Sequence, residues 1–203
     1  MMPPTSSTAG QPEDGSRELR SDARRNRQRV LEAAQVAFAT DGLAVPLDQI
    51  ARRAGVGAGT VYRHFPNKET LFEAVVFDRL RRLVGEARSL ASSKEPGEAF
   101  FGFLRRMVEE GLAKKDLLDA LAGAGIDVDV GSSPVSQELR GVVGELLADA
   151  QHAGAVREDV GVAEVMVLLL GTALAIRQRA GEGGESARIV AVVCDGLRSF
   201  SPR

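Results

Sequence analysis

The sequence predicts an all-α protein, and three observations support this. Apolar residues recur at every third or fourth position in one segment after another, the spacing that places side chains on one face of a helix. No segment alternates apolar and polar residues over the length of a strand. Aromatic residues make up only 4% of the 203 residues, with no Trp and one Tyr, whereas sheets favour aromatic and β-branched side chains.

The overall composition excludes several classes of protein. A hydrophobic fraction of 44% and a charged fraction of 27% are ordinary for a globular chain and argue against disorder or a collagen-like repeat. The single cysteine, Cys194, excludes an internal disulfide and any site of several thiolates. One cysteine also suits a reducing compartment, so a cytoplasmic location is expected.

The first twenty residues are predicted to form a disordered tail. Their opening segment, MMPPTSSTAGQPEDGS, has almost nothing apolar to bury, and it lacks the cationic and apolar regions of a signal peptide. The first helix is expected to begin at Ser21, which suits the N-cap position. It is expected to end at Asp41-Gly42, because glycine favours a helix stop.

Two short helices are expected next, over 46–55 and 58–64. Pro46 suits a first helical residue, and Gly55 suits a helix end. Because only Gly55-Val56-Gly57 joins the two helices, the segment 46–65 is predicted to be a helix-turn-helix. Its inward-facing residues are expected to be Ile50, Ala54, Val56 and Val61.

The rest of the chain is predicted to be helical as well. Asn67 suits the N-cap of a long fourth helix that extends to about Ser89. A fifth apolar stripe runs from Pro96 to Gly123, with a break expected near Lys114-Lys115. Further helices are expected at 134–153, 160–180 and about 189–200. The apolar stretch 160–176 is not expected to span a membrane, because Glu164 interrupts it and a bilayer requires ~20 mainly apolar residues.

Charge is distributed unevenly along the chain. Residues 17–82 hold thirteen basic and eight acidic residues, whereas residues 83–203 hold thirteen basic and eighteen acidic ones. A basic first part on an acidic body is typical of a protein whose first part meets a polyanion. Six cations cluster before and within the start of the first helix, namely Arg17, Arg20, Arg24, Arg25, Arg27 and Arg29.

These six arginines are expected to contact phosphates or the minor groove as a flexible arm. Arg24 and Arg25 are the stronger candidates, and a solvated helix face is an equal alternative for Arg27 and Arg29. The outer face of the third helix offers small, hydroxyl, aromatic and basic groups that suit phosphates and base edges. These residues are Ala58, Gly59, Thr60, Tyr62, Arg63 and His64.

From Arg24 to about Arg82 the chain resembles the DNA-binding domain of TetR-family transcriptional regulators. The segments RVLEAAQVAFATDG, LDQIARRAGV and GTVYRHFPNKETLFEAVV, with their separations, carry the resemblance. It implies a DNA-binding domain over 21–82, which the fourth helix joins to an effector-binding and dimerisation domain over 83–203. It also implies a homodimeric repressor that binds a palindromic DNA operator and is released by a small apolar effector.

The resemblance places the phosphate-contacting residues of the family on Thr60, Tyr62, His64 and Lys68. Lys68 would sit in the first turn of a helix, where the macrodipole disfavours a cation unless a phosphate lies beside it. Two departures from the family pattern bear on recognition. Gly57-Ala58 replaces a frequent Ser-Lys, and Pro46 replaces a frequent capping Thr. Base reading is therefore left open among Ala58, Gly59 and Arg63.

The C-terminal part offers two tentative sites. Phe100, Phe103 and Met107 are either core or the lining of the effector pocket, and the two interpretations overlap. The last two helices are expected to pair the subunits as a four-helix bundle. The residues expected in that interface are Val165, Leu168, Leu169, Thr172, Ile176, Ile189, Val193 and Leu197.

No catalytic site, cofactor site or metal site is expected. No cluster of His, Asp and Ser or of metal ligands stands out, so an enzyme is the least favoured class. His152 is expected to be a helix-end partner, Asp127 and Asp129 to be solvated loop acids, and Cys194 to be buried packing. The alternative to an effector-released repressor is a DNA-binding or protein-binding regulator without a small-molecule effector.

Overall fold

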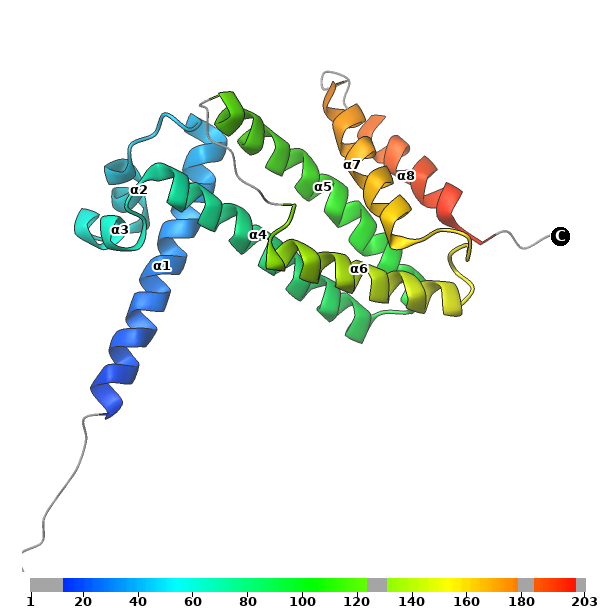
Figure 1. The fold of residues 1–203 in the computed structure, drawn as a ribbon, viewed down its shortest axis with the longest axis horizontal. Helices are drawn as coiled ribbons and strands as arrows, with labels where there is room; N and C mark the ends of the chain where they lie inside the picture. Colours follow the sequence, from blue (N-terminus) through cyan, green and yellow to red (C-terminus); the bar gives the residue numbers. More distant parts are fainter. Residues whose placement is uncertain (1–12, 124–130, 179–184, 200–203) are drawn as a thin grey trace, which may run out of the picture.

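The computed structural model describes residues 13–123, 131–178 and 185–199. Within these ranges the chain forms eight helices, and the only β-pairing is an isolated antiparallel bridge between Val156 and Arg198. The all-α prediction is therefore confirmed. The helices, shown in Figure 1, are α1 (Glu13–Asp41), α2 (Leu47–Ala54), α3 (Ala58–His64), α4 (Lys68–Ser93), α5 (Pro96–Gly123), α6 (Pro134–His152), α7 (Val162–Gln178) and α8 (Glu185–Leu197).

The first three helices and the start of α4 form one small packed unit at an end of the molecule (Figure 1). α2 packs on α1 and α3, and α4 packs on α1. The rings of Phe38 and Phe72 lie 5.8 Å apart between α1 and α4, a favourable aromatic separation. The unit's fully buried residues are Val30, Ala34, Ala37, Ile50, Val61, Leu71 and Phe72.

α4 runs from this unit into the C-terminal body, as Figure 1 shows. It begins sharply, because the Asn67 side chain accepts a hydrogen bond from the Thr70 backbone N–H at 2.8 Å, as an N-cap residue does. Further along, α4 packs against α5 and α6. A single helix of 26 residues therefore connects both parts of the molecule.

α5 lies at the centre of the C-terminal body and packs against α4, α6, α7 and α8. Its apolar face is almost completely buried at Phe100, Phe103 and Leu104. Ion pairs cross its surface, including Arg106 to Glu86 at 2.9 Å. Such partly exposed pairs stabilise a fold by less than about 1 kcal/mol, so apolar packing holds the body together.

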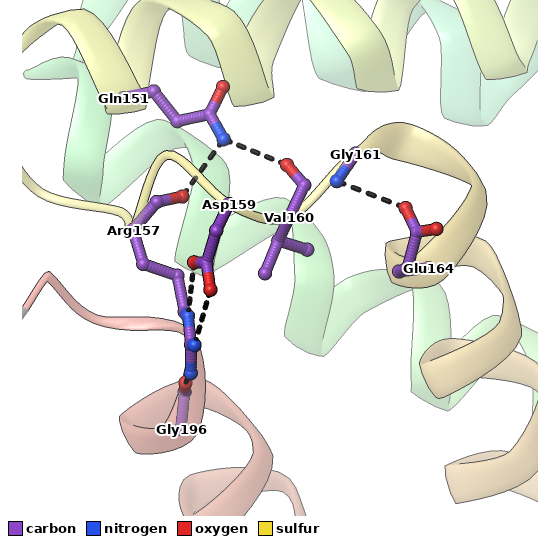
Figure 2. A network of polar contacts seen from close by, with 7 residues as sticks. All are labelled: Gln151, Arg157, Asp159, Val160, Gly161, Glu164 and Gly196. Atoms are coloured by element: carbon purple, nitrogen blue, oxygen red, sulfur yellow. Dashed lines mark hydrogen bonds and ion pairs between the residues drawn. The ribbon is translucent and has the colours of Figure 1, made fainter.

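The connection from α6 to α7 is fastened by polar contacts, which Figure 2 shows. The Gln151 amide donates to the backbone carbonyls of Arg157 at 2.9 Å and Val160 at 2.8 Å. The Arg157 guanidinium donates to both carboxylate oxygens of Asp159 at 2.6 Å, which lowers the pKa of Asp159. A further contact from Arg157 to the Gly196 carbonyl at 3.4 Å ties this loop to α8.

Several predicted helix boundaries were wrong, including the end of α4, which lies at Ser93 rather than at about Ser89. α1 begins at Glu13 rather than Ser21, because each residue added to an existing helix gains a hydrogen bond without needing apolar contacts. The predicted tail over 1–20 is thus helical from Glu13, and residues 1–12 lie outside the described ranges. α5 continues through Lys114-Lys115 without a break, because lysine is a good helix former. Pro46 is the N-cap, one residue before the helix.

Candidate nucleic-acid interface

The turn between α2 and α3 has the geometry of a glycine helix end. Gly55 adopts a left-handed backbone, with φ of 63°, which glycine takes without the penalty of a Cβ. The Gly55 and Val56 N–H groups donate to the Arg52 and Ala51 carbonyls, each at 3.1 Å, so the last carbonyls of α2 are satisfied. The chain then reverses within three residues, and the predicted helix-turn-helix over 46–65 is present.

α3 presents one face to the core and the other to solvent. Val61 is its only buried residue, whereas Ala58, Gly59 and Arg63 are exposed and Tyr62 is 47% exposed. Thr60 and His64 are half-buried at the edges of this face. The structure thus brings the six predicted α3 residues to one end of the molecule, with the longest side chains pointing outward.

The two residue changes noted at the helix starts leave both helices without side-chain caps. Neither Pro46 before α2 nor Gly57 before α3 makes a side-chain capping hydrogen bond. Asp48 lies in the first turn of α2, and its charge raises the pKa of the Tyr62 hydroxyl above its ordinary value. Desolvation and a hydrogen bond with the same carboxylate raise this pKa further.

Lys68 has a partner within the protein. Its ammonium donates to the backbone carbonyl of Leu43, in the loop between α1 and α2, at 2.7 Å. This contact offsets the unfavourable position of a cation in the first turn of α4. An ammonium has three N–H donors, so a phosphate contact by Lys68 stays a prediction alongside this tertiary role.

The N-terminal arginines do not form a flexible arm, because residues 17–29 lie within α1. Arg24 and Arg25 are exposed, and Arg25 pairs with Asp22 on the same helix. Arg29 Nη2 donates to the Gly55 carbonyl at 3.2 Å. The Arg27 guanidinium lies over the Phe65 ring, 5.4 Å from its centroid. Of the four arginines whose side chains are described, two therefore face outward and two reach toward the chain on either side of α3.

Several cations around the helix-turn-helix lack a carboxylate partner in the described part of the chain. Arg53 pairs with Asp41 at 2.6 Å, but Arg24, Arg52 and Arg63 make no ion pair there and are exposed. Unpaired cations on one surface attract a phosphate backbone. Arg52 was not singled out from the sequence, although its position in the last turn of an exposed helix face was a usable indication.

The predicted effector residues lie in the core of the C-terminal body. Phe100 and Phe103 are buried, and Met107 is half-buried against the same cluster. Both interpretations offered by the sequence, core and pocket lining, are compatible with this position.

The predicted dimer face is mostly inside the protomer. Five of its eight residues are buried by the protomer's own helices, and Ile189 and Val193 are half-buried. Those five are Val165, Leu169, Thr172, Ile176 and Leu197. Only Leu168 is exposed. The prediction chose the inward face, because an almost wholly apolar helix does not reveal from its sequence which side meets the core.

The exposed apolar residues of α7 and α8 are different ones. Val167, Leu170 and Leu174 are 70%, 70% and 39% exposed, and Val192 on α8 is 64% exposed. Positions 167, 170 and 174 are separated by three and four residues, so they form one stripe along α7. This stripe, together with Val192 and Leu168, is called the outer α7/α8 face below.

The remaining candidates have structural roles where they can be described. His152 is the exposed last residue of α6. Cys194 is buried, and this burial raises the pKa of its thiol. Asp127 and Asp129 lie outside the described ranges. Among the described side chains, no three acidic, His or Cys residues are grouped as a metal site would require.

The structure has a surface cavity that the sequence did not predict. It has a volume of about 380 Å³ and lies between the start of α5 and the segments after α6 and α8. Phe101 lies in its wall beneath the Arg198 guanidinium, 4.6 Å from ring centroid to carbon. Glu95, Glu98, Arg105 and Arg198 all line it, so its ionised groups balance. No pattern in the sequence joins these distant segments.

Together, a tight glycine turn, a short outward-facing helix and unpaired cations define a helix-turn-helix DNA-binding protein. Two family models match the chain: "Bacterial regulatory proteins, tetR family" over residues 30–75, and "Transcriptional regulator SbtR-like, C-terminal domain" over residues 95–199. The chain belongs to the TetR family of transcriptional regulators. These regulators are not enzymes, as expected from the sequence.

Solved structures of similar proteins agree with this assignment. A TetR transcription regulatory protein from Mycobacterium vanbaalenii is 50% identical, with 89% of this chain and 99% of that chain covered and a TM-score of 0.74. The TetR transcriptional regulator SCO0520 from Streptomyces coelicolor is 33% identical, with 86% and 99% covered and a TM-score of 0.70.

A similar curated protein is the uncharacterized HTH-type transcriptional regulator TtgW from Pseudomonas putida. It is 42% identical over 65 residues, which are 32% of this chain and 48% of that protein. The chain therefore spans about half the length, or less, of the curated relatives it matches. In the described part of the chain, no helix has both the length and the apolar character needed to cross a bilayer.

Proposed function

We propose that this chain is a homodimeric repressor that binds a palindromic operator in the cytoplasm and is released from it by a small apolar effector. The observation that carries the DNA-binding part is the outer face of α3. There Tyr62 and Arg63 are exposed while their neighbour Val61 is fully buried. A helix held by its inner side, with donors on its outer side, suits insertion into a major groove.

The outer α7/α8 face supports a dimer. A single exposed apolar residue requires no explanation, but an apolar stripe of three residues on one helix is costly to leave in water. Pairing of α7 and α8 with the same helices of a second copy would bury Val167, Leu170 and Val192 in a four-helix bundle. Such a two-fold dimer presents two copies of α3.

A two-fold dimer favours an operator with inverted symmetry. One short helix contacts only a few base pairs, and two related helices in successive major grooves lie ~34 to 36 Å apart. The operator would then repeat one half-site in inverted orientation. Repression follows if the dimer occupies a promoter. Transcription in vitro from a promoter that carries the bound sequence tests this, and adding the protein should lower the amount of transcript. Increased transcription on addition of the protein would contradict repression.

α4 supplies a connection for release by an effector. Its 26 residues make a rod of roughly 39 Å at ~1.5 Å per residue. At its first residue, Lys68 is bonded to the Leu43 carbonyl at 2.7 Å, so the start of α4 moves together with the loop before α2. Its later turns pack on α5 and α6. A shift of α4 in the body would therefore change the spacing of the two α3 helices.

We place the apolar effector among Phe100, Phe103 and Met107, because α5 packs directly against α4. An effector that favours one position of α4 also favours one spacing of the two α3 helices. If the operator requires the other spacing, the effector weakens operator binding, with a coupling free energy of typically ~1 to 3 kcal/mol. Linkage requires the reverse effect: saturating operator must weaken effector binding by the same factor. Calorimetric titration of the effector with and without operator measures this, and equal affinities would contradict the allosteric part.

The second candidate is a DNA-binding or protein-binding regulator without a small-molecule effector. The burial of Phe100 and Phe103 by the protein's own side chains favours it. A thermal-shift screen with apolar compounds distinguishes the two candidates, because a ligand that binds the native state raises its melting temperature. A Phe103→Ala variant is the matched control, since it enlarges the interior at the proposed site and should alter the response to a true ligand.

A further inference from the structure

α3 has little of its own to hold its orientation. It is seven residues long, and Val61 is its only buried residue. A helix of two turns is barely stable by itself. One buried side chain fixes a single point of the helix but not its orientation. The orientation of α3 must therefore depend on its two ends, which are the Gly55 turn before it and Phe65 after it.

Both ends are contacted from α1. Arg29 Nη2 donates to the Gly55 carbonyl at 3.2 Å, and the Arg27 guanidinium lies 5.4 Å from the centroid of the Phe65 ring. Residues two positions apart point to different sides of a helix, so these two side chains reach to either side of α1. One contacts the chain before α3 and the other contacts the chain after it.

The Gly55 position is shaped around this contact. A Cβ at Gly55 would lie 2.5 Å from Arg29 Nη2, so a side chain at this position would force the guanidinium to move from its present place. Phe65 is itself buried and is a firm support for a cation on its ring face. Arg24, one turn earlier on α1, is exposed and makes no comparable contact in the described part of the chain.

We propose that Arg27 and Arg29 are positioning residues that brace the two ends of the recognition helix, and that Arg29 is not a phosphate ligand. Arg24 keeps the phosphate-contacting role expected of the cluster. The brace fixes the angle of α3 in the free protein. The expected effect of the brace on DNA affinity rests on the proposed function, whereas its effect on the orientation of α3 in the free protein does not.

The first experiment uses the full chain without DNA. Hydrogen exchange is measured for the backbone amides of 55–65 in the wild type and in the Arg29→Met, Arg29→Lys and Arg24→Met variants. Loss of a hydrogen bond from a charged donor should make exchange in the turn about tenfold faster in Arg29→Met. Arg29→Lys keeps a donor and should restore most of the protection, and Arg24→Met should match the wild type.

The second experiment measures affinity for a selected operator and for random DNA as a function of salt. Arg29→Met should reduce the ratio of specific to non-specific affinity without changing the salt slope. Arg24→Met should instead lower the magnitude of the slope by about 0.9 for each phosphate that is no longer neutralised. A merely structural role would leave both the slope and the discrimination ratio unchanged once equal amounts of folded protein are compared.

Two results would overturn the brace. One is exchange in 55–65 that is equal in the wild type and Arg29→Met. The other is a salt slope that falls in Arg29→Met as much as in Arg24→Met, because Arg29 would then be a phosphate ligand. If the wild type bound no DNA, the proposed function would fail, and the exchange experiment would still decide whether the brace exists.

Discussion

Gly55→Ala tests the helix-turn-helix geometry most sharply among single substitutions. The change adds a Cβ to a residue with φ of 63°, at a point 2.5 Å from Arg29 Nη2. Two costs are expected. A residue other than glycine pays roughly 1 to 2 kcal/mol for a left-handed backbone. Because the Arg29 side chain is exposed and flexible, it can swing away, so the second cost is the lost hydrogen bond to Gly55.

That hydrogen bond contributes about 0.5 to 1.5 kcal/mol, which gives a total destabilisation of about 1.5 to 3.5 kcal/mol for Gly55→Ala. Gly42→Ala is the matched control. Gly42 has φ of 73°, and a Cβ there meets nothing within 4 Å, so this variant has only the backbone cost. The difference between the two variants isolates the displacement of Arg29.

Urea unfolding at one fixed protein concentration measures both free energies, since the stability of a dimer depends on concentration. In an Arg29→Met background, Gly55→Ala should cost no more than Gly42→Ala, because the displaced group is gone. The reasoning is refuted if Gly55→Ala and Gly42→Ala destabilise the wild type equally. It is also refuted if the Arg29→Met background leaves the cost of Gly55→Ala unchanged.

Three further predictions concern other parts of the molecule. Arg63→Ala should relax preference at one operator position by about 1 to 3 kcal/mol, measured on single-base variants of the site; an unchanged preference assigns Arg63 to the backbone. Leu170→Asp should yield folded monomers in sedimentation, whereas Val165→Asp should lower the unfolding free energy; a dimeric Leu170→Asp contradicts the outer α7/α8 face. Burial raises the pKa of Cys194, so less thiolate forms in the folded state: alkylation should be slower than in urea-unfolded protein, and stability should fall as pH rises above the ordinary thiol pKa.

The helix-turn-helix was predictable because its boundaries are set by local chemistry. Gly55 ends α2, Gly57 precedes α3, and Phe65-Pro66 ends α3, and each of these choices follows from backbone preferences of the residues involved. The side chain of Asn67 caps α4 as expected. Such features require no knowledge of what lies across the fold.

The misplaced dimer face and the unforeseen partner of Lys68 both depend on tertiary contacts. Val165 and Val167 are both apolar residues of α7, yet one is buried and the other is 70% exposed. The sequence of an apolar helix does not distinguish them, because apolar residues occupy every face of the helix and no polar face marks the side toward solvent. Likewise, the partner of Lys68 is a backbone carbonyl 25 positions earlier, and every residue type offers that same carbonyl. Only the folded chain shows which one is used.

Selection of bound sequences from a random DNA pool tests the central claim most directly, namely that a two-fold dimer reads DNA with α3. The wild type should select an inverted repeat whose half-sites are centred about one helical turn or somewhat more apart. A Tyr62→Ala, Arg63→Ala double variant, which changes only the exposed face of α3, should lose this enrichment while remaining folded. Enriched sites without inverted symmetry, or the same sites selected by the double variant, would contradict the account.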